Sequence, residues 1–150
     1  MAAITDSFTT QFKQDLLDGV HQTGDTYKAV LIKAGYTGTY DASSTYANVT
    51  GNSDECPATG GYSTGGMTLS GRSSSIVSTT AWLDFSDLVI SSATISAAGV
   101  MIINSTRSNK VLGVFNTRDP SGGGVTTITA TNGTFTLNIP RTGTGLFSIA

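Results

Sequence analysis

The stretch from Thr126 to Ile139 alternates apolar and polar residues on both sides of an Asn132-Gly133 pair. An Asn-Gly pair between alternating runs favours a two-residue type I′ turn and therefore a β-hairpin. Threonines and one asparagine would then line one wet face, as in an antiparallel sheet that is buried on the other side. The turn would set three pairs of residues opposite each other on the buried face: Ala130 with Phe135, Ile128 with Leu137, and Thr126 with Ile139.

Short apolar runs set among Gly, Ser and Thr recur through most of the chain, and they predict further strands. The predicted strands are Tyr27–Lys33, Gly66–Ser70, Ser75–Thr80, Trp82–Phe85, Thr94–Asn104, Val111–Asn116 and Gly145–Ala150. No alternation of strands with helices, no repeat and no charged or proline-rich boundary divides the 150 residues. The sequence therefore predicts a single domain, residues 1–150, in which an all-β antiparallel β-sandwich or barrel-like fold occupies residues 26–150.

The N-terminal segment is the one clear helix candidate, because Phe8, Phe12, Leu16 and Val20 recur every four residues. Thr5 or Asp6 suits the helix start and Gly19 its end, so we predict a helix or arm over residues 5–20. Two interpretations stay open: the helix packs on its own domain, or it is an arm whose Phe8 and Phe12 dock on a neighbouring subunit. Its polar residues are expected to face water: Gln11, Lys13, Gln14, Asp15 and Asp18.

Residues 35–65 form a long stretch rich in Gly, Ser, Thr and Tyr, with little periodicity. Loops of this length in a compact domain are usually functional or mobile. Tyrosine offers an apolar body and a polar tip, so it can stack on a sugar, bury at an interface, or pin the loop to its own sheet. The candidate contact residues in or near this stretch are Tyr36, Tyr40, Tyr46 and Tyr62.

Composition and charge exclude several classes of partner. The net charge is -2 and the eight basic residues are scattered, so no stripe of cations can follow a phosphate backbone. The longest apolar run, Ala97–Ile103, is too short to span a bilayer. The first residues lack the basic region and apolar core of a signal peptide. We therefore expect direct contact with neither nucleic acid nor membrane.

Residues 61–65 read Gly-Tyr-Ser-Thr-Gly, the pattern that holds a serine nucleophile in α/β-hydrolases. A serine nucleophile needs a base, and in the hydrolase order the histidine follows the serine. The one histidine, His21, precedes Ser63, and the segment lacks the preceding strand and the following helix. We therefore predict no catalytic residue and no enzyme activity, with the glycines serving to bend the chain into a strand.

Other reactive side chains are too few or too poorly spaced for a known type of site. One His and one Cys do not make a usual zinc set, and the spacing of a calcium loop is absent. No Gly-Lys-Ser/Thr follows the glycines at 60–66 to bind phosphate. Asp54 and Glu55 would raise the pKa of the neighbouring Cys56 and leave it unreactive. The sequence thus predicts no metal and no cofactor.

Five stretches carry a resemblance to a known group of proteins. They are YKAVLIKAGYT (27–37), GGYSTGGMTLSG (60–71), WLDFSDLVISSATISAAGVMIINST (82–106), KVLGVFN (110–116) and NGTFTLNIP (132–140). In this order they resemble small structural proteins of tailed-bacteriophage virions, of the head decoration or cement type. The stretches span most of the chain after the predicted helix.

The resemblance implies a virion structural protein, made in the host cytoplasm, that sits on the outer surface of the phage head. It would stabilise the capsid by bridging subunits of the major capsid protein, in many copies or as a homo-oligomer, so that weak contacts add up. The contacts would come from Phe8, Phe12 and the four tyrosines. Two alternatives remain: a tail or head–tail junction component, and a carbohydrate-binding adhesin module that uses the tyrosines.

Overall fold

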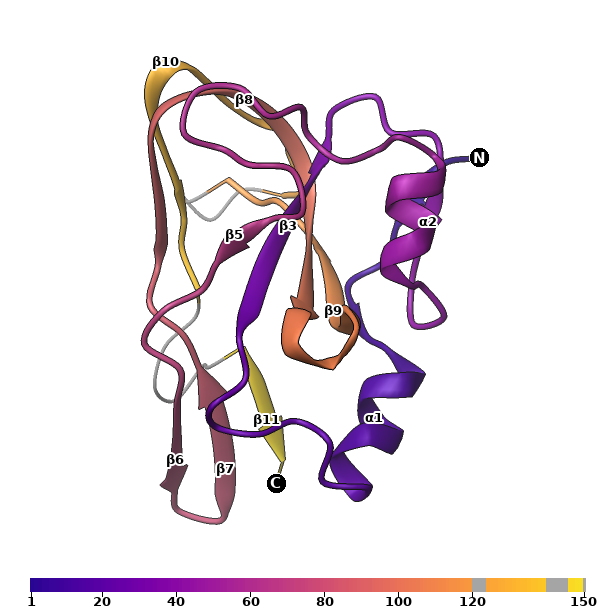
Figure 1. Cartoon of the computed structure of the whole chain (residues 1–150), viewed down its shortest axis with the longest axis vertical. Coiled ribbons are helices and arrows are strands. Elements are labelled where there is room, and N and C mark those ends of the chain that lie inside the picture. Colours follow the sequence, from indigo (N-terminus) through magenta and orange to yellow (C-terminus); the bar gives the residue numbers. More distant parts are fainter. Residues whose placement is uncertain (120–123, 140–145, 150) are drawn as a thin grey trace.

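The computed structural model describes residues 1–119, 124–139 and 146–149, and it is mostly β (Figure 1). Apart from the short parallel pair of β1 and β4, the paired strands run antiparallel, so the predicted all-β antiparallel class is confirmed. The strands are β1 Ala3–Ile4, β2 Ser7–Phe8, β3 Tyr27–Lys33, β4 Thr39–Tyr40, β5 Met67–Thr68, β6 Ser73–Val77, β7 Thr80–Asp84, β8 Leu88–Asn104, β9 Lys110–Asn116, β10 Ile128–Leu137 and β11 Phe147–Ile149. The helices are α1 Thr10–Leu17, α2 Tyr46–Gly51 and a 3₁₀ turn at Ser105–Arg107.

The long strand β8 organises the main sheet. Its C-terminal half pairs with β3 on one side and with β9 on the other, while its N-terminal half pairs with β10. β10 continues the line of β9 along the same side of β8, because Asn116 lies opposite Gly99 and Ile128 lies opposite Ala97. Between the two strands, Arg118 pairs with Val125 in an isolated antiparallel bridge. The strand prediction for Thr94–Asn104 was therefore too short at its N-terminal end.

The two-residue turn predicted at Asn132-Gly133 is wrong, because β10 runs straight through this pair beside β8. Asn132 has φ 48 and Ser92 of β8 has φ 54, and the pairing register shifts on both sides of Gly133. Ala130 to Gly133 spans three residues against two on β8, and Gly133 to Phe135 spans two against three. Each strand thus carries one extra residue, so the two bulges compensate and bend the sheet.

The bulge also explains why the apolar sorting of this segment is right although its turn is wrong. The extra residue in β10 shifts the alternation, so even-numbered residues before it and odd-numbered residues after it face the same way. On the inner side Phe135 and Ile139 are buried, and Ile128, Ala130 and Leu137 pack against the same core.

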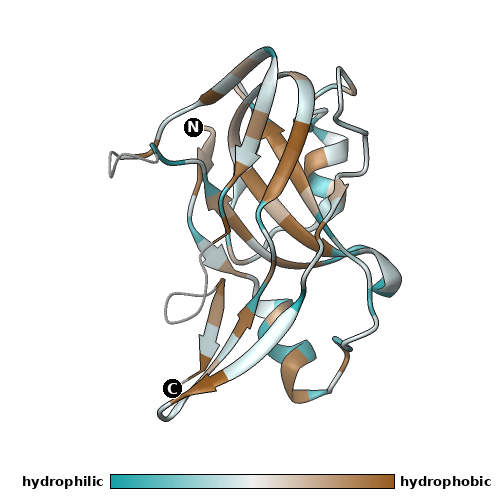
Figure 2. Ribbon diagram, turned by 90° about the vertical axis from the view of Figure 1, so that its left-hand side faces the viewer, coloured by the Kyte–Doolittle hydropathy of each residue, from teal (hydrophilic) through white to brown (hydrophobic). Residues whose placement is uncertain are grey.

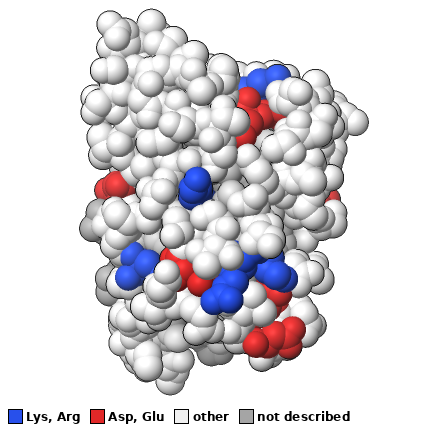
Figure 3. All heavy atoms as spheres, in the orientation of Figure 1, with Lys and Arg blue, Asp and Glu red and all other residues white. Residues whose placement is uncertain are grey.

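A separate three-stranded sheet, in the order β11-β7-β6, projects from the body. Figure 1 shows β6, β7 and β11 at the end of the molecule where α1 also ends, and Figure 2 shows apolar segments on these strands out to the C-terminal end. Ser73 to Leu83 carry no charged residue, and the tip of the β6–β7 hairpin is free of charged side chains in Figure 3. A two-residue turn at Ser78-Thr79 joins β6 to β7, so the single strand predicted at Ser75–Thr80 is wrong.

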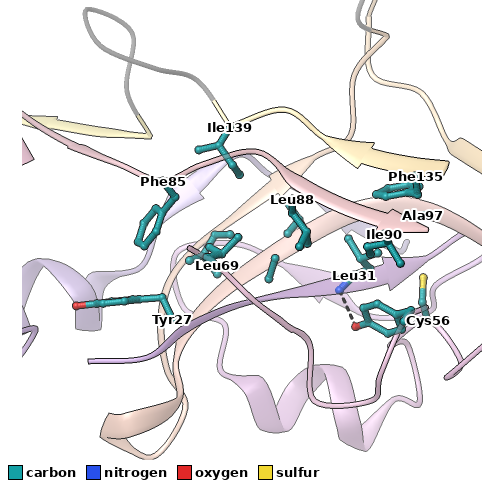
Figure 4. Packing of buried hydrophobic residues seen from close by; sticks show 14 of the residues in the cluster. Tyr27, Leu31, Cys56, Leu69, Phe85, Leu88, Ile90, Ala97, Phe135 and Ile139 are labelled. Carbon is teal, nitrogen blue, oxygen red and sulfur yellow. Dashed lines mark hydrogen bonds between the residues drawn. The ribbon is translucent and has the colours of Figure 1, made fainter. Parts of the chain in front are cut away.

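Over β3, β9 and the C-terminal half of β8, the main sheet is buried on both faces, which explains the nearly continuous apolar runs there. One face packs Leu31, Ile102 and Leu112 against the strand β10 and the segment from Cys56 to Leu69. Figure 4 shows Tyr27, Phe85, Leu88 and Ile139 converging on this side. The other face packs a second cluster against the N-terminal segment and the stretch from Tyr36 to Val49: Val30, Ile32, Met101, Ile103 and Val114, with Ile4, Tyr40 and Val49.

The N-terminal segment corrects the helix prediction for residues 5–20. Residues before Thr10 form β1 and β2, and α1 begins only after Thr9, whose hydroxyl accepts a hydrogen bond from the Phe12 amide at 3.0 Å. Thr5 and Asp6 do not cap it. Gly19 follows the helix with φ 64, as predicted for the residue after a C-cap. Asp15, expected to face water, is buried.

The tyrosine-rich stretch holds a second helix that the sequence did not reveal. Thr45 and Asn48 form a capping box at the start of α2, with the Thr45 amide donating to Asn48 Oδ1 at 2.7 Å. The prediction of a single helix was therefore incomplete. Strand β11 lies within the predicted Gly145–Ala150, whose two end residues fall outside the described ranges.

We expect Thr9→Ala to lower the free energy of unfolding by about 2 kcal/mol. The buried Thr9 hydroxyl caps α1 and also donates to the Val111 carbonyl at 2.6 Å, so the variant leaves two backbone groups without their partner. Urea denaturation measures the loss. The control Thr10→Ala, at the exposed first residue of the helix, should leave stability within about 0.5 kcal/mol. Equal stability of the two variants would contradict this cap.

Candidate functional site

The Gly-Tyr-Ser-Thr-Gly segment is fixed by one carboxylate, that of Glu55. Glu55 Oε1 accepts hydrogen bonds from the Tyr62 hydroxyl at 2.8 Å and from the amides of Gly65 at 2.7 Å and Gly66 at 3.2 Å. The buried Tyr62 hydroxyl in turn accepts from the Leu31 amide of β3 at 3.0 Å. Gly65 and Gly66 have φ of 89 and 82, conformations that L side chains rarely adopt.

This geometry bears on Ser63. Its side chain is exposed, and the amides of Gly65 and Gly66 that follow it bind Glu55. Burial and the neighbouring Glu55 raise the pKa of Tyr62. The segment is therefore built as a braced turn that leads into β5, as the bending role of its glycines predicted.

His21 belongs to a buried polar network at the end of the sheet near α1. The Asn104 side-chain amide contacts His21 Nδ1 at 3.0 Å, and His21 Nε2 lies 3.4 Å from Asp15 Oδ2. Lys110 Nζ donates to Asp15 Oδ1 at 2.8 Å, and Asn104 also donates to Asp25 at 2.8 Å. Burial lowers the pKa of His21 despite the attraction of Asp15, so the ring is held neutral.

His21 Nε2 faces Asp15 Oδ2 without forming a hydrogen bond. Nδ1 accepts from Asn104, which leaves the hydrogen on Nε2, facing Asp15. Asp25 binds Arg107 Nε at 3.0 Å, and this pairing strongly lowers the pKa of the Asp25 carboxyl. The network joins α1, β8 and β9, and its arrangement is that of an internal brace.

Asp54 holds a second network, on the face of the sheet covered by the tyrosine-rich stretch. It is buried, and it accepts from the Tyr40 hydroxyl at 2.6 Å, the Gly38 amide at 2.8 Å and the Thr37 amide at 2.9 Å. Burial raises the pKa of Asp54, but the hydrogen bonds outweigh burial and hold the pKa below its ordinary value. Burial and the bond to Asp54 raise the pKa of Tyr40 to about 12.

Cys56 is buried, and burial followed by the charge of Glu55 raises the pKa of its thiol to about 12. Within residues 1–119, 124–139 and 146–149, no three His, Cys, Asp or Glu side chains gather in a way that could hold a metal ion. Among the helices of these same ranges, none is long and apolar enough to cross a membrane.

The structure divides the six predicted contact residues. Phe12, Tyr40 and Tyr62 are buried inside the domain and offer a partner almost no surface, which corrects their prediction as contacts. Phe8 is half-buried, with its ring centroid 4.9 Å from that of Phe147 and 5.4 Å from that of Phe115.

Tyr36 and Tyr46 are the other half-buried members of the set. Tyr36 lies against Tyr40, with ring centroids 6.1 Å apart, and the Tyr46 hydroxyl donates to Glu55 Oε2 at 3.2 Å. Most of the predicted contact residues therefore pin their own loop or helix to the sheet, which was one of the interpretations left open.

An apolar hollow and a polar hollow lie in the described surface. The apolar one, of about 540 Å³, opens between β9 and β10 and is lined by Val100, Ile102, Phe115, Phe135 and Leu137, with Asp6 and Arg118 at its polar side. The polar one, of about 470 Å³, lies between α1, α2 and the start of β9. Its walls are Gln11, Ser44, Thr45, Tyr46, Ala47, Thr50, Ser108, Asn109, Lys110 and Val111.

The projecting sheet carries an exposed apolar row that the sequence reading missed. Ile76 of β6 pairs with Ala81 of β7, and Ala81 pairs with Ile149 of β11, so the three side chains share one face. Ile76 is 78% exposed and Ile149 is 55% exposed. The next row inward on that face ends in Leu83 and Phe147, which pack against the core. The apolar face of the projecting sheet thus extends beyond the core and is exposed to solvent at its outer end.

A weak signal for this row was present in the sequence. Ile76 and Val77 are the apolar residues in a run of serines and threonines. In β7, Ala81 and Leu83 alternate with Thr80, Trp82 and Asp84. Only the pairing of β7 with β11, from the far end of the chain, brings Ile149 beside them. We call Ile76, Ala81 and Ile149 the apolar row, and it is the candidate functional site.

Comparison with known proteins adds no relative: no family model, no curated protein and no solved structure matches the chain.

We expect Asp54→Asn to lower the free energy of unfolding by about 2–4 kcal/mol near pH 7, because an amide cannot accept all the bonds that converge on this buried site. The pKa of Asp54 lies below its unfolded value, so its stabilisation is complete above about pH 4 and fades as the pH falls through the folded pKa. The gap between wild type and variant in urea denaturation should therefore shrink between pH 5 and pH 2.

The matched control is Asp18→Asn, at an exposed carboxylate just after α1. Its effect should stay within about 0.5 kcal/mol. A gap for Asp54→Asn that is unchanged down to pH 2 would show that the carboxylate does not provide the stabilisation.

Proposed function

We propose that this protein is a non-enzymatic structural protein of a tailed-phage virion, which decorates the outer surface of the head and bridges subunits of the major capsid protein. The observation that carries the proposal is the apolar row on the projecting sheet, whose residues from Ser73 to Leu83 carry no charge. The ordered resemblance of five stretches to phage decoration proteins supports it from the sequence side. The reactive side chains described above, which brace the fold from within, are compatible with such a role.

The apolar row has the chemistry of a protein contact. Burying a large aliphatic side chain contributes about 1.5–3 kcal/mol relative to leaving it in water, and the row offers two isoleucines at its ends. Leu17, 85% exposed, lies at the end of α1, which Figure 1 places at the same end of the molecule. No charge on Ser73 to Leu83 has to be desolvated when this surface is covered.

The strength of such a contact comes from repetition. One projecting sheet is smaller than the roughly 20–30 residues per side of a standard stable interface. Many copies on a shell act together, so rupture or expansion of the shell must break many weak contacts at once. A tail or head–tail junction position would use the same surface, and the position of the protein in a particle reconstruction separates these two locations.

Purified protein should rebind to particles that lack it, and Ile76→Thr should weaken this binding by about tenfold or more, because one buried aliphatic side chain is lost. Sedimentation of fluorescently labelled protein with depleted particles measures the binding. The control is Val89→Thr, which changes another exposed aliphatic residue, 57% exposed, on β8. Particles saturated with wild type should also retain their DNA to a higher temperature than depleted ones.

Equal binding of both variants would rule out the apolar row as the contact. Equal heat stability of coated and depleted particles would remove the bridging role, even if the protein binds.

Carbohydrate binding is a second candidate function, favoured by one observation. The polar hollow sets the half-buried ring of Tyr46 beside hydroxyl and amide side chains of Thr45, Ser108 and Asn109. Such a set can stack on the apolar face of a sugar while exchanging hydrogen bonds with its hydroxyls. Tyr40 and Tyr62, two of the other tyrosines considered for this role, are buried.

If the hollow binds a sugar, glycan-array signal should appear with wild type and fall at least about tenfold with Tyr46→Ala. The control Tyr36→Ala, at a half-buried tyrosine outside the hollow, should keep the signal. Absence of any glycan signal from wild type would dismiss this candidate.

A further inference from the structure

The strand β6 is an open edge of the projecting sheet. Among the described residues β7 is its only strand partner, and all five of its residues, Ser73–Val77, are exposed. Natural edges are usually protected by charged residues, proline or a bulge, because their unpaired amides and carbonyls otherwise pair with other strands. β6 contains no charged residue and no proline, and its register with β7 is unbroken. Such an edge is prepared for strand addition.

The register of the hairpin tells which backbone groups are free. Val77 and Thr80 flank the two-residue turn, so they form the hydrogen-bonded pair that closes it. Pairs alternate along an antiparallel ladder, so Ser75 and Ser73 also bond to β7, while Ile76 and Ser74 do not. The amide and carbonyl groups of Ser74 and Ile76 therefore point away from β7 toward the open edge.

We propose that β6 of one copy pairs antiparallel with β6 of a second copy, about a two-fold axis that passes through Ser75. In this register Ser74 of each copy lies opposite Ile76 of the other, so the outward groups of both strands meet and exchange hydrogen bonds. The two Ser75 residues face each other as a non-hydrogen-bonded pair. The inference rests on the edge itself and stands independently of the proposed function.

Charge and symmetry favour a second copy over another partner. Between Ser73 and Leu83 neither copy brings a charge, so the two-fold pairing sets no like charges side by side. An isologous contact needs a surface that complements itself. This edge complements itself through Ser74 and Ile76, whose backbone groups are free. A partner strand of other chemistry would find no charged residue on this edge to select it.

Pairing also keeps the apolar rows together. Antiparallel addition about an axis perpendicular to the sheet preserves its faces, so Ile76 of both copies lies on the same side of one continuous sheet. The area involved is small, hence we expect a weak dimer in free solution, with a dissociation constant on the order of 0.1–1 mM. High local concentration on a surface would populate it.

Symmetric disulfide formation tests the axis directly. Ser75→Cys should form a disulfide-linked dimer under mild oxidation, since non-hydrogen-bonded pairs bring their Cβ atoms within about 4.5–5.5 Å. The control Ser73→Cys, also exposed on β6, lies opposite Val77 of the other copy and should cross-link at least about tenfold more slowly. Cys56 is buried, so wild type should give no cross-link. Equal cross-linking at the two positions would overturn the proposed register.

Proline at the edge tests the backbone bonds. Ser74→Pro removes an outward amide without removing a bond to β7, and Ser74→Ala keeps that amide. Sedimentation equilibrium from 10 μM to about 2 mM should show dimer formation by wild type and Ser74→Ala, and at least about tenfold weaker association of Ser74→Pro. Monomeric wild type throughout this range, or equal association of both variants, would overturn the proposal.

The two assays also separate this inference from the proposed function. If β6 does not self-associate but the protein still binds depleted particles through Ile76, only the self-pairing fails. If self-association occurs without particle binding, the proposed function fails and the edge pairing stands.

Discussion

The fold depends on one constraint: the C-terminal half of the long strand β8 is buried on both faces, so its backbone must be satisfied by neighbours on both sides. Over residues 99–104 it has β3 on one side and β9 on the other, and toward its N-terminus it is covered by β10. An unpaired amide or carbonyl in such a place costs as much as a lost hydrogen bond. The path of the chain, which returns along β8 as β9 and then β10, follows from this requirement.

Where the backbone is irregular, carboxylates provide the hydrogen-bond acceptors that a neighbouring strand would otherwise supply. Asp54 binds the amides of Thr37 and Gly38, Glu55 binds those of Gly65 and Gly66, and Asp15 ties α1 to Lys110 of β9. Each gathers donors that the sheet cannot pair. These three carboxylates therefore connect segments within the domain, and the projecting sheet carries no charge from Ser73 to Leu83.

Periodicity in the sequence was enough to predict the fold class and the inner face of β10, because alternation and burial are local properties. It was not enough to distinguish a turn from a bulge at Asn132-Gly133, since both shift the alternation by one residue and only the position of β8 decides between them. The spacing of Phe8 and Phe12 predicted a helix over residues 5–20 that is too long. Phe8 instead lies in β2, which pairs with β9.

The candidate site was predicted less well, for a related reason. The aromatic residues predicted as contacts have large side chains. Large apolar side chains next to a sheet tend to be buried in its core, as Phe12, Tyr40 and Tyr62 are. The apolar row joins Ile76 to Ile149 across two strand pairings, and no local pattern links positions that far apart. Likewise, the pairing of Asp54 with Tyr40 depends on the course of the whole tyrosine-rich stretch.

The matched bulges at Ser92 and Asn132 let each strand hold one residue more than a regular ladder needs. Because the bulge absorbs the extra residue, removing Asn132 would return β10 to regular alternation and leave Phe135 on the inner face. Removing Ser92 as well would leave equal numbers of residues on the two strands, so the ladder would run without a bulge and the bend would straighten. The two extra residues therefore set the curvature of the sheet, while the core stays on its own side.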